Sequence, residues 1–333
     1  MDSFTQIVLG AAVGEAVLGK KAGNKAMLYG AIAGTIPDLD IFAEYFTDTV
    51  TTIELHRGFS HSIVFSVLFA PVFGCLISRI ENRGAAHWKD WSWLMFWGLF
   101  THPILDSFTT WGTQLFWPLD IRLAFKSIFV IDPLYTLPFL IFLILAMRSK
   151  RGSKKRRKYN NLGLIISSAY LLLSLGLKSV SFIKFQNALE EQQVSYRQIE
   201  TKPSPFNTIL WTANVETENT FLIGDYSFFD TQPILFNSYP KDHHLLGALA
   251  SEEKVQRLID ISNGWYKISK ENGNIFFHDL RFGVLDPNAA NPTFVFTYKI
   301  LEEEGEVVIQ EVERNPEEAK RLLSVLGNRI FGN

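Results

Sequence analysis

Apolar stretches separated by short polar segments dominate the first 182 residues of this 333-residue chain. The first two, at residues 4–19 and 22–36, are rich in alanine and glycine and are short for a membrane span, which needs about 20 apolar residues. Their small side chains allow close helix packing, so we expect them to form an inner pair. Four further spans are predicted at residues 61–80, 91–106, 128–147 and 162–182. The pattern therefore predicts an α-helical polytopic membrane domain of about six helices, the first two short.

The pattern changes after residue 182, where an amphipathic stretch to residue 195 is expected to extend the last helix out of the bilayer. Short apolar runs bounded by Pro, Asn and Gly then predict strands at 208–215, 220–228, 275–281, 293–300 and 306–312. Helices are expected at 246–261 and 316–330, and an amphiphilic loop at 41–60. We therefore predict a membrane-embedded domain at residues 1–185 and a soluble α+β domain at residues 186–333.

Basic residues indicate the orientation of the membrane domain. Eight of the eleven residues at 148–158 are Lys or Arg, and residues 20–25 and 79–90 are also basic. Short loops rich in Lys and Arg stay in the cytoplasm, and the predicted spans place all three loops on one side. The C-terminal domain is therefore expected outside the cytoplasm. A basic run between two spans indicates topology, so no nucleic-acid partner is expected; membrane lipids are the expected neighbours.

Composition narrows the chemistry that is available. Apolar residues make up 47% of the chain, a high share given how polar the C-terminal part is. The single cysteine, Cys75, lies within an apolar run, which excludes internal disulfides and a cysteine-based zinc site. No cleavable signal peptide is expected, because Asp2 stands where a basic segment would be.

Three polar clusters fall at the predicted outer ends of the helices. They are Asp38 with Asp40, His56 with His61, and His102 with Asp106. His102 and Asp106 are four residues apart, so both side chains face the same way on one helix. His56 and His61 cannot share a helical face, but they could share an ion if His56 lies in the loop and His61 on the first turn. We expect the clusters to converge on one metal site, with His56, His61, His102, Asp106 and Asp38 as ligands.

Imidazoles and carboxylates without thiols suit Zn, Mn or Fe, and we expect one or two divalent ions, with zinc favoured. Asp38, Asp40 and Arg57 are the predicted catalytic residues, with either Asp38 or Asp40 completing the ligand set. Arg57 and Arg122 are phosphate clamps or, as an equal alternative, anchors for lipid headgroups. Glu15 lies in an apolar segment, where an acidic residue is costly, and either lines the same cavity or pairs with a lysine.

The sequence resembles a family of bacterial membrane-bound proteins predicted to be metal-dependent hydrolases, one branch of which carries a LexA-binding label. The resemblance covers residues 1–180 and rests on four motifs: Met1–Gln6, Pro37–Asp40, His56–Ser62 and His102–Asp106. It implies an inner-membrane, multi-pass hydrolase that depends on a metal. Many members of the family carry His where this chain has Gln6, so the resemblance does not extend to a metal ligand at the N-terminus. A looser similarity to zinc-dependent phospholipase C implies phosphodiester chemistry.

We therefore expect a membrane-bound hydrolase that uses metal-activated water at the outer bilayer surface, on a phosphoester or lipid-like small-molecule substrate. Two alternatives stay open. A transporter or ion pathway would also use Glu15 and polar residues in glycine-rich helices. A metal-stabilised scaffold would use the outer domain to bind a partner.

Overall fold

The computed structural model describes residues 1–333 except 83, 287–291, 304, 314–322 and 324. The chain forms two compact units. The first, which we call the helical unit, comprises Met1–Ala43, Leu55–Gly176 and Pro205–Asn207. The second, the sheet unit, comprises Glu44–Glu54, Leu177–Ser204 and Thr208–Asn333.

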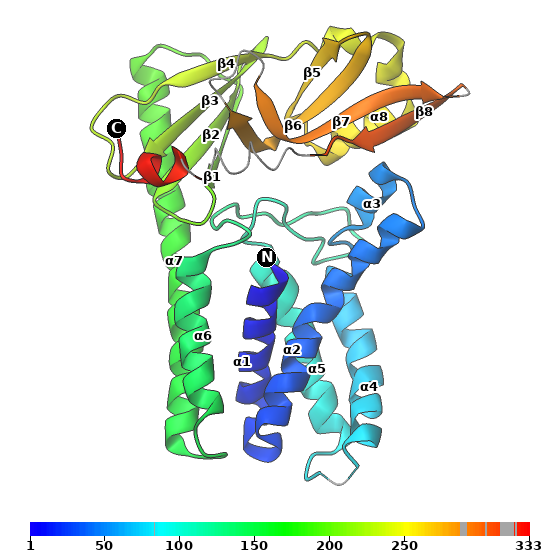
Figure 1. Cartoon of the computed structure of the whole chain (residues 1–333), viewed down its shortest axis with the longest axis vertical. Helices are drawn as coiled ribbons and strands as arrows, with labels where there is room; N and C mark the ends of the chain where they lie inside the picture. The colour runs from blue at the N-terminus through cyan, green and yellow to red at the C-terminus, as the bar shows by residue number, and fades with distance from the viewer. Residues whose placement is uncertain (83, 287–291, 304, 314–322, 324) are drawn as a thin grey trace. The chain divides into compact units, whose positions relative to one another are not determined.

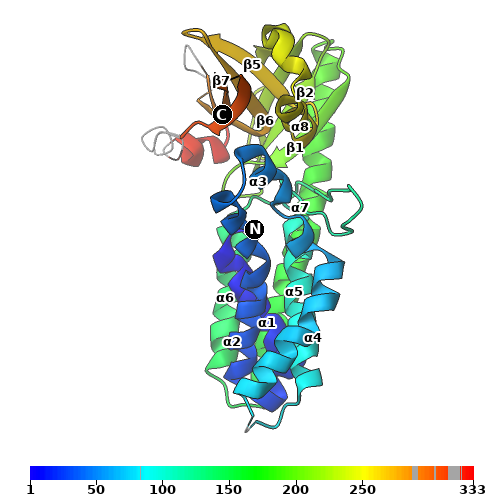
Figure 2. The same ribbon diagram turned by 90° about the vertical axis from the view of Figure 1, so that its right-hand side faces the viewer.

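All six predicted apolar stretches are helical in the structure. Figures 1 and 2 show α1, α2, α4, α5 and α6 side by side in the helical unit. Their bounds are α1 Ser3–Ala22, α2 Asn24–Thr35, α4 Ile63–Ile80, α5 Trp88–Asp106 and α6 Pro133–Met147, followed by α7 Lys154–Glu191. Helix α6 begins later than residue 128 because the Asp132 side chain caps the Leu134 and Tyr135 amides and Pro133 occupies the first turn.

Three segments of the described chain are long and apolar enough to cross a membrane. They are Asn24–Tyr45, Ile63–Ile80 and Lys154–Glu191, and α6 is a shorter apolar helix. The first continues from α2 into the 3-10 helix η1, Ile36–Tyr45. Helix α7 extends without interruption to Glu191, as the amphipathic continuation of the last predicted span suggested. The N-terminal part is thus a helical region with three candidate membrane spans.

The prediction of a loop at residues 41–60 is wrong, because most of this segment is helical. After η1 come α3, Thr49–Leu55, and the short 3-10 helix η2, Phe59–His61. Asp48 starts α3 by accepting hydrogen bonds from the Val50 and Thr51 amides. Most of α3 belongs to the sheet unit, where Val50 is buried in the hydrophobic core and Glu54 pairs with Arg257 at 2.6 Å. Tertiary packing outweighs the low helix propensity of its β-branched residues.

The described residues of the sheet unit form two four-stranded antiparallel sheets. The first has the order β1–β2–β3–β4 and the second β5–β6–β7–β8. The strands of the first sheet are β1 Gln198–Pro203, β2 Leu210–Glu216, β3 Thr220–Ser227 and β4 Phe236–Pro240. Those of the second are β5 Tyr266–Glu271, β6 Asn274–Asp286, β7 Thr293–Glu303 and β8 Glu306–Glu311. The five predicted strands correspond to β2, β3, β6, β7 and β8, whereas β1, β4 and β5 were not predicted.

The helix predicted at 246–261 is divided into η3, His243–Ser251, and α8, Glu253–Ile261. The backbone is not helical at Gly247, whose φ is 53°. Of the helix predicted at 316–330, residues 325–330 are helical, and most of the rest lies outside the described residues.

The first sheet carries apolar residues on both faces. Trp211, Ala213 and Val215 pack against Phe185 and Leu189 of α7. The opposite face meets the second sheet through apolar contacts, in which Phe221 and Ile223 share a buried cluster with Leu280, and through hydrogen bonds. The Lys202 ammonium donates to the carbonyls of Leu280 and Arg281, at 3.2 and 2.6 Å, and the Asn214 amide donates to Leu280 at 2.7 Å. These bonds fall where β6 departs from regular pairing, so they satisfy carbonyls that the ladder leaves free.

Candidate metal centre

Glycine contacts between α1 and α2 set the position of the candidate site. A Cβ on Gly30 would lie 2.2 Å from the carbonyl oxygen of Gly10, and one on Gly34 would lie 2.4 Å from that of Gln6. Only glycine permits such close backbone approach. The approach brings the end of α2 against α5, where the Gly34 carbonyl accepts a hydrogen bond from His102 Nδ1 at 2.7 Å.

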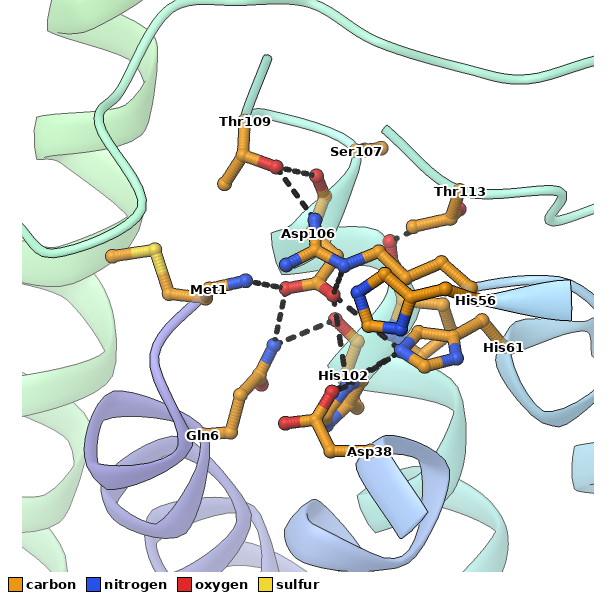
Figure 3. Close-up of polar contacts among 12 residues, drawn as sticks. Met1, Gln6, Asp38, His56, His61, His102, Asp106, Ser107, Thr109 and Thr113 are labelled. Carbon is orange, nitrogen blue, oxygen red and sulfur yellow. Dashed lines mark hydrogen bonds and ion pairs between the residues drawn. The ribbon is translucent and has the colours of Figure 1, made fainter. Parts of the chain in front are cut away.

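Four side chains converge at the end of the bundle where α2 and α5 finish and α4 begins (Figure 3). Asp38 lies in η1, His61 ends η2, and His102 and Asp106 lie on the last turn of α5. One ligand atom from each can be chosen so that all lie within 4.8 Å of one another. His61, His102 and Asp106 are fully buried, whereas the Asp38 side chain is 17% exposed. The sequence predicted this convergence of three clusters.

The shortest distances join the two imidazoles and the nearest carboxylate oxygens. His61 Nε2 lies 3.1 Å from His102 Nε2, and Asp38 Oδ1 lies 3.4 and 3.3 Å from these two nitrogens. Asp106 Oδ2 lies 3.5 Å from His61 Nε2 and 3.7 Å from His102 Nε2. Four tetrahedral ligands at about 2.0–2.2 Å from one zinc ion would be roughly 3.3–3.6 Å apart. Five of the six distances between the ligand atoms are thus close to this separation, so the cluster could hold a metal ion.

The hydrogen bonds of the imidazoles fix the direction of their lone pairs. His102 Nδ1 faces a carbonyl, which can only accept, so this nitrogen carries the proton. His61 Nδ1 lies 3.2 Å from Asp40 Oδ2 and 3.0 Å from Ser60 Oγ, whose own hydroxyl donates to Asp40. That arrangement also assigns the proton to Nδ1. In the neutral rings both Nε2 atoms then carry lone pairs that point at each other and at two carboxylates, and a cation between them removes the repulsion.

Asp40 holds the turn that carries His61. Its carboxylate lies 3.0 Å from His56 Nδ1 and accepts from the Arg57 amide at 2.8 Å and from the Ser60 hydroxyl at 3.1 Å. Asp40 and His61 form the carboxylate–histidine pair that commonly orients a metal ligand. Asp38, rather than Asp40, belongs to the four-residue cluster.

His56, which the sequence predicts as a ligand, is not among the four. Its ring centre lies 6.3 Å from that of His61 and 5.6 Å from that of Trp111. The side chain is 31% exposed and its Nδ1 contacts Asp40. The structure therefore places His56 at the edge of the cluster, on the far side of Asp40.

Asp106 is contacted by donors at both of its carboxylate oxygens. The Gln6 amide donates to its Oδ1 at 2.7 Å, and the Met1 amine contacts the same oxygen. Arg57 Nε lies 3.0 Å from its Oδ2. Gln6 Oε1 is buried without a hydrogen-bond partner among the described residues. Gln6 thus supports Asp106 by a hydrogen bond.

Arg57 is a buried partner of Asp106 in this structure. Its guanidinium also donates to the Thr109 hydroxyl at 2.9 Å. Its backbone adopts a φ of 58°, an uncommon value for a residue with a Cβ, and the bond from its amide to Asp40 holds it there. Arg122, the second expected phosphate clamp, donates to the His56 carbonyl at 3.2 Å.

Glu15 lies apart from the cluster, in a buried ion pair. Both of its carboxylate oxygens accept from Arg156 of α7, which also bonds to Asn24. The sequence suggested a lysine partner or the shared cavity, and the basic run contains the actual partner. Because this carboxylate is neutralised, Glu15 no longer favours the transport alternative.

Three supporting groups were not found from the sequence: the Gly34 carbonyl, the Ser60 hydroxyl and the Thr109 hydroxyl. A backbone carbonyl leaves no signal in a sequence. Thr109 follows Asp106 by three residues, a spacing that brings a hydroxyl back over the preceding turn, where it also bonds to the Asp106 carbonyl at 2.7 Å.

Comparison with known proteins agrees with the sequence motifs of the helical unit. The family model for the YdjM inner membrane protein matches residues 1–180. Inner membrane protein YbcI of Escherichia coli strain K12 is 34% identical over 101 residues, which are 30% of this chain and 57% of that protein. The chain thus covers little more than half the length of this relative. No solved structure matches. The family match confirms the resemblance carried by the Asp and His motifs.

Proposed function

Because the chain belongs to the YdjM inner membrane protein family, the family of membrane-bound metal-dependent hydrolases, we propose that it is such a hydrolase. The observation that carries the proposal is the convergence of two imidazole Nε2 atoms and two carboxylates within 4.8 Å. Burial lowers the pKa of His61, but the neighbouring carboxylates outweigh this and raise it to about 9, so the cluster attracts a positive charge, either a proton or a metal ion. The chemistry of the four groups suits Zn, Mn or Fe, with zinc favoured, and their spacing favours one ion.

In this proposal Asp38, His61, His102 and Asp106 hold the ion. When bound, the ion supplies Lewis-acid polarisation and lowers the pKa of a coordinated water. Asp40 and the Gly34 carbonyl fix the two imidazoles with Nε2 toward the ion. Arg57 balances the charge of Asp106, which leaves Asp38, the most exposed ligand, on the side open to substrate.

We propose that the substrate is a phosphoester that meets the site at the outer, non-cytoplasmic face of the inner membrane. Three considerations support this. The cluster lies at the ends of candidate spans, the basic loops lie at their opposite ends, and Arg57 and Arg122 add positive charge beside the cluster. A phosphoester would bring negative charge to an ion and two guanidinium groups.

A metal-stabilised scaffold is the second candidate, and the number of ligands favours it. Structural zinc sites have four protein ligands, whereas catalytic sites keep one position for water. The described cluster offers four. Hydrolysis therefore requires either a fifth coordination position for water or the release of one carboxylate from the ion. Asp38 is the ligand best placed to leave, because it is partly exposed whereas the other three are fully buried.

The experiment measures metal and activity together. Detergent-purified protein and the variants His102→Ala and His244→Ala are compared by elemental analysis and by hydrolysis of bis(p-nitrophenyl) phosphate. His244 is exposed in η3, so its variant is the matched control. The proposal expects one bound ion and measurable turnover in the wild type and the control, and neither in His102→Ala. Bound metal without turnover would favour the scaffold, and absence of metal from the wild type would refute both.

A further inference from the structure

Exposed apolar side chains surround the end of the bundle that carries the cluster, on segments that lie between the long helices. They occur in η1 and in the loop 111–127 that follows α5. All are between 45% and 58% exposed. We call them the apolar rim: Leu39, Ile41, Phe42, Phe116, Leu119, Ile121 and Phe125.

The loop that carries most of the rim is fixed to the start of a candidate span. The Leu115 carbonyl accepts a hydrogen bond from the Ile63 amide, the first residue of α4, at 3.0 Å. The Trp117 ring packs on Phe59 with ring centres 4.8 Å apart, and Phe59 packs on Phe65 of α4. A bridge between Thr113 and Leu123 closes the loop on itself. The rim is therefore held in place at the end of α4.

The rim continues surfaces that belong in lipid. In the span α4, Val67, Leu68, Val72 and Leu76 are exposed over roughly half of their surface, as side chains that face acyl chains must be. The η1 part of the rim is itself the final part of the candidate span Asn24–Tyr45. The loop contacts α4 directly, so its exposed Leu and Phe side chains extend the same apolar surface beyond the helix end.

The same loop directs Arg122 at the residues of the site, because its guanidinium donates to the His56 carbonyl. The Gln114 side chain lies 3.3 Å from the carboxylate of Asp120, which is exposed between Leu119 and Ile121. The loop thus has an outward side that is mostly apolar, with one exposed carboxylate among the apolar residues. Amphipathic segments of this kind lie at the boundary between headgroups and acyl chains. A contiguous exposed apolar patch on a protein marks an interaction surface.

We propose that the apolar rim inserts into the lipid bilayer at the headgroup–acyl boundary, so that the partner of this surface is the phospholipid itself. The loop then forms a membrane-inserted collar beside the cluster. The inference depends on the described packing of the loop and on the spans, and it requires neither a bound metal nor a reaction.

Depth-dependent fluorescence quenching tests this insertion. The single cysteine is first removed by Cys75→Ser. A new cysteine is then introduced in the full chain by Leu119→Cys and labelled with an environment-sensitive nitrobenzoxadiazole probe. Asn237→Cys, exposed on β4 in the sheet unit, is the matched control. The protein is reconstituted into phosphatidylcholine vesicles that contain lipids with a nitroxide near the headgroup end of the acyl chain. We expect the nitroxide to quench the Leu119 label by roughly half and to leave the Asn237 label unquenched.

Aqueous iodide provides the complementary measurement. Insertion predicts that iodide quenches the Asn237 label and spares the Leu119 label. Equal access of iodide to both labels would overturn the proposal. Protection of the Leu119 label from iodide and nitroxide alike would also overturn it, because a protein surface, and not lipid, would then cover the rim. Ile121→Cys gives the same readout if the Leu119 variant does not fold.

Discussion

The variant Asp40→Asn tests a residue that orients a candidate metal ligand, because Asp40 contacts His61 but is not one of the four residues of the cluster. The Asp40 carboxylate accepts from the Arg57 amide and the Ser60 hydroxyl and faces His56 Nδ1 and His61 Nδ1, at 2.8 to 3.2 Å. An amide of the same shape presents one acceptor oxygen and turns an NH₂ group toward some of these donors. The His61 ring then loses the charged partner that fixes its tautomer, while the four ligand atoms of the cluster are retained.

We expect Asp40→Asn to bind the same number of ions per protein with lower affinity. Removing an outer partner of a metal-bound His typically weakens binding by about 10–100-fold, which is about 1.4–2.7 kcal/mol. Competition with a chromophoric zinc chelator measures the dissociation constant of the purified protein. Asp120→Asn, which alters an exposed carboxylate of the loop, is the control and should leave the constant unchanged.

Two outcomes would contradict this reasoning. Unchanged affinity in Asp40→Asn would show that the carboxylate does not orient His61. Complete loss of the ion, as expected for His102→Ala, would show that Asp40 is itself a ligand, the assignment that the sequence left open beside Asp38.

Three further predictions follow from packing and charge. Gly30→Val should destabilise the helical unit by about 1–3 kcal/mol, because the added Cβ would lie 2.2 Å from the Gly10 carbonyl oxygen. Thermal unfolding in detergent measures this effect, and an unchanged unfolding midpoint would contradict the described packing. Arg156→Met should lower the free energy of unfolding by about 3–5 kcal/mol, because it leaves Glu15 buried without its counter-ion. The double variant with Glu15→Gln should recover part of this loss in the same assay. Burial, aided by Lys267, lowers the pKa of His278 to about 4. Below pH 6.5 the unfolded state therefore binds more protons than the folded state, and the free energy of unfolding of the sheet unit should fall by up to about 3 kcal/mol between pH 6.5 and pH 4. Urea titrations of the wild type and His278→Gln check this, and equal pH dependence in both would refute the assignment.

The sequence was most informative where helix geometry alone decides the outcome. His102 and Asp106 face the same way because they are four residues apart on α5, and the structure brings both into the cluster. Asp38 and His61 joined them because each lies where a helical segment ends or begins. His56 could not be placed, because the turn after it depends on the left-handed backbone of Arg57 and on Asp40, 16 residues earlier in the chain.

In the sheet unit, local pattern was sufficient for the central strands and for the edge strand β8, and insufficient for the edge strands β1, β4 and β5. β1 and β4 are rich in polar residues, and in β1 the polar Lys202 occupies a buried position. In β5 the alternation is limited to Tyr266 and Ile268, which is too short for a strand prediction. Lys202 and Lys267 are satisfied by bonds to carbonyls and carboxylates of distant segments. Because such partners are set by tertiary structure, the local sequence carries no trace of them.

The segment Glu44–Glu54 gives the sheet unit a part in the energetics of the metal centre. Asp40 precedes this segment and His56 follows it, and both belong to the helical unit. Val50 and Glu54 anchor the segment within the sheet unit, through the hydrophobic core and the ion pair with Arg257. A connection anchored in this way has already lost much of its conformational entropy, so bringing its two ends together costs less than closing a free loop of the same length. We therefore expect any ion that the cluster holds to bind more weakly when the sheet unit is unfolded, although the four described ligands all belong to the helical unit.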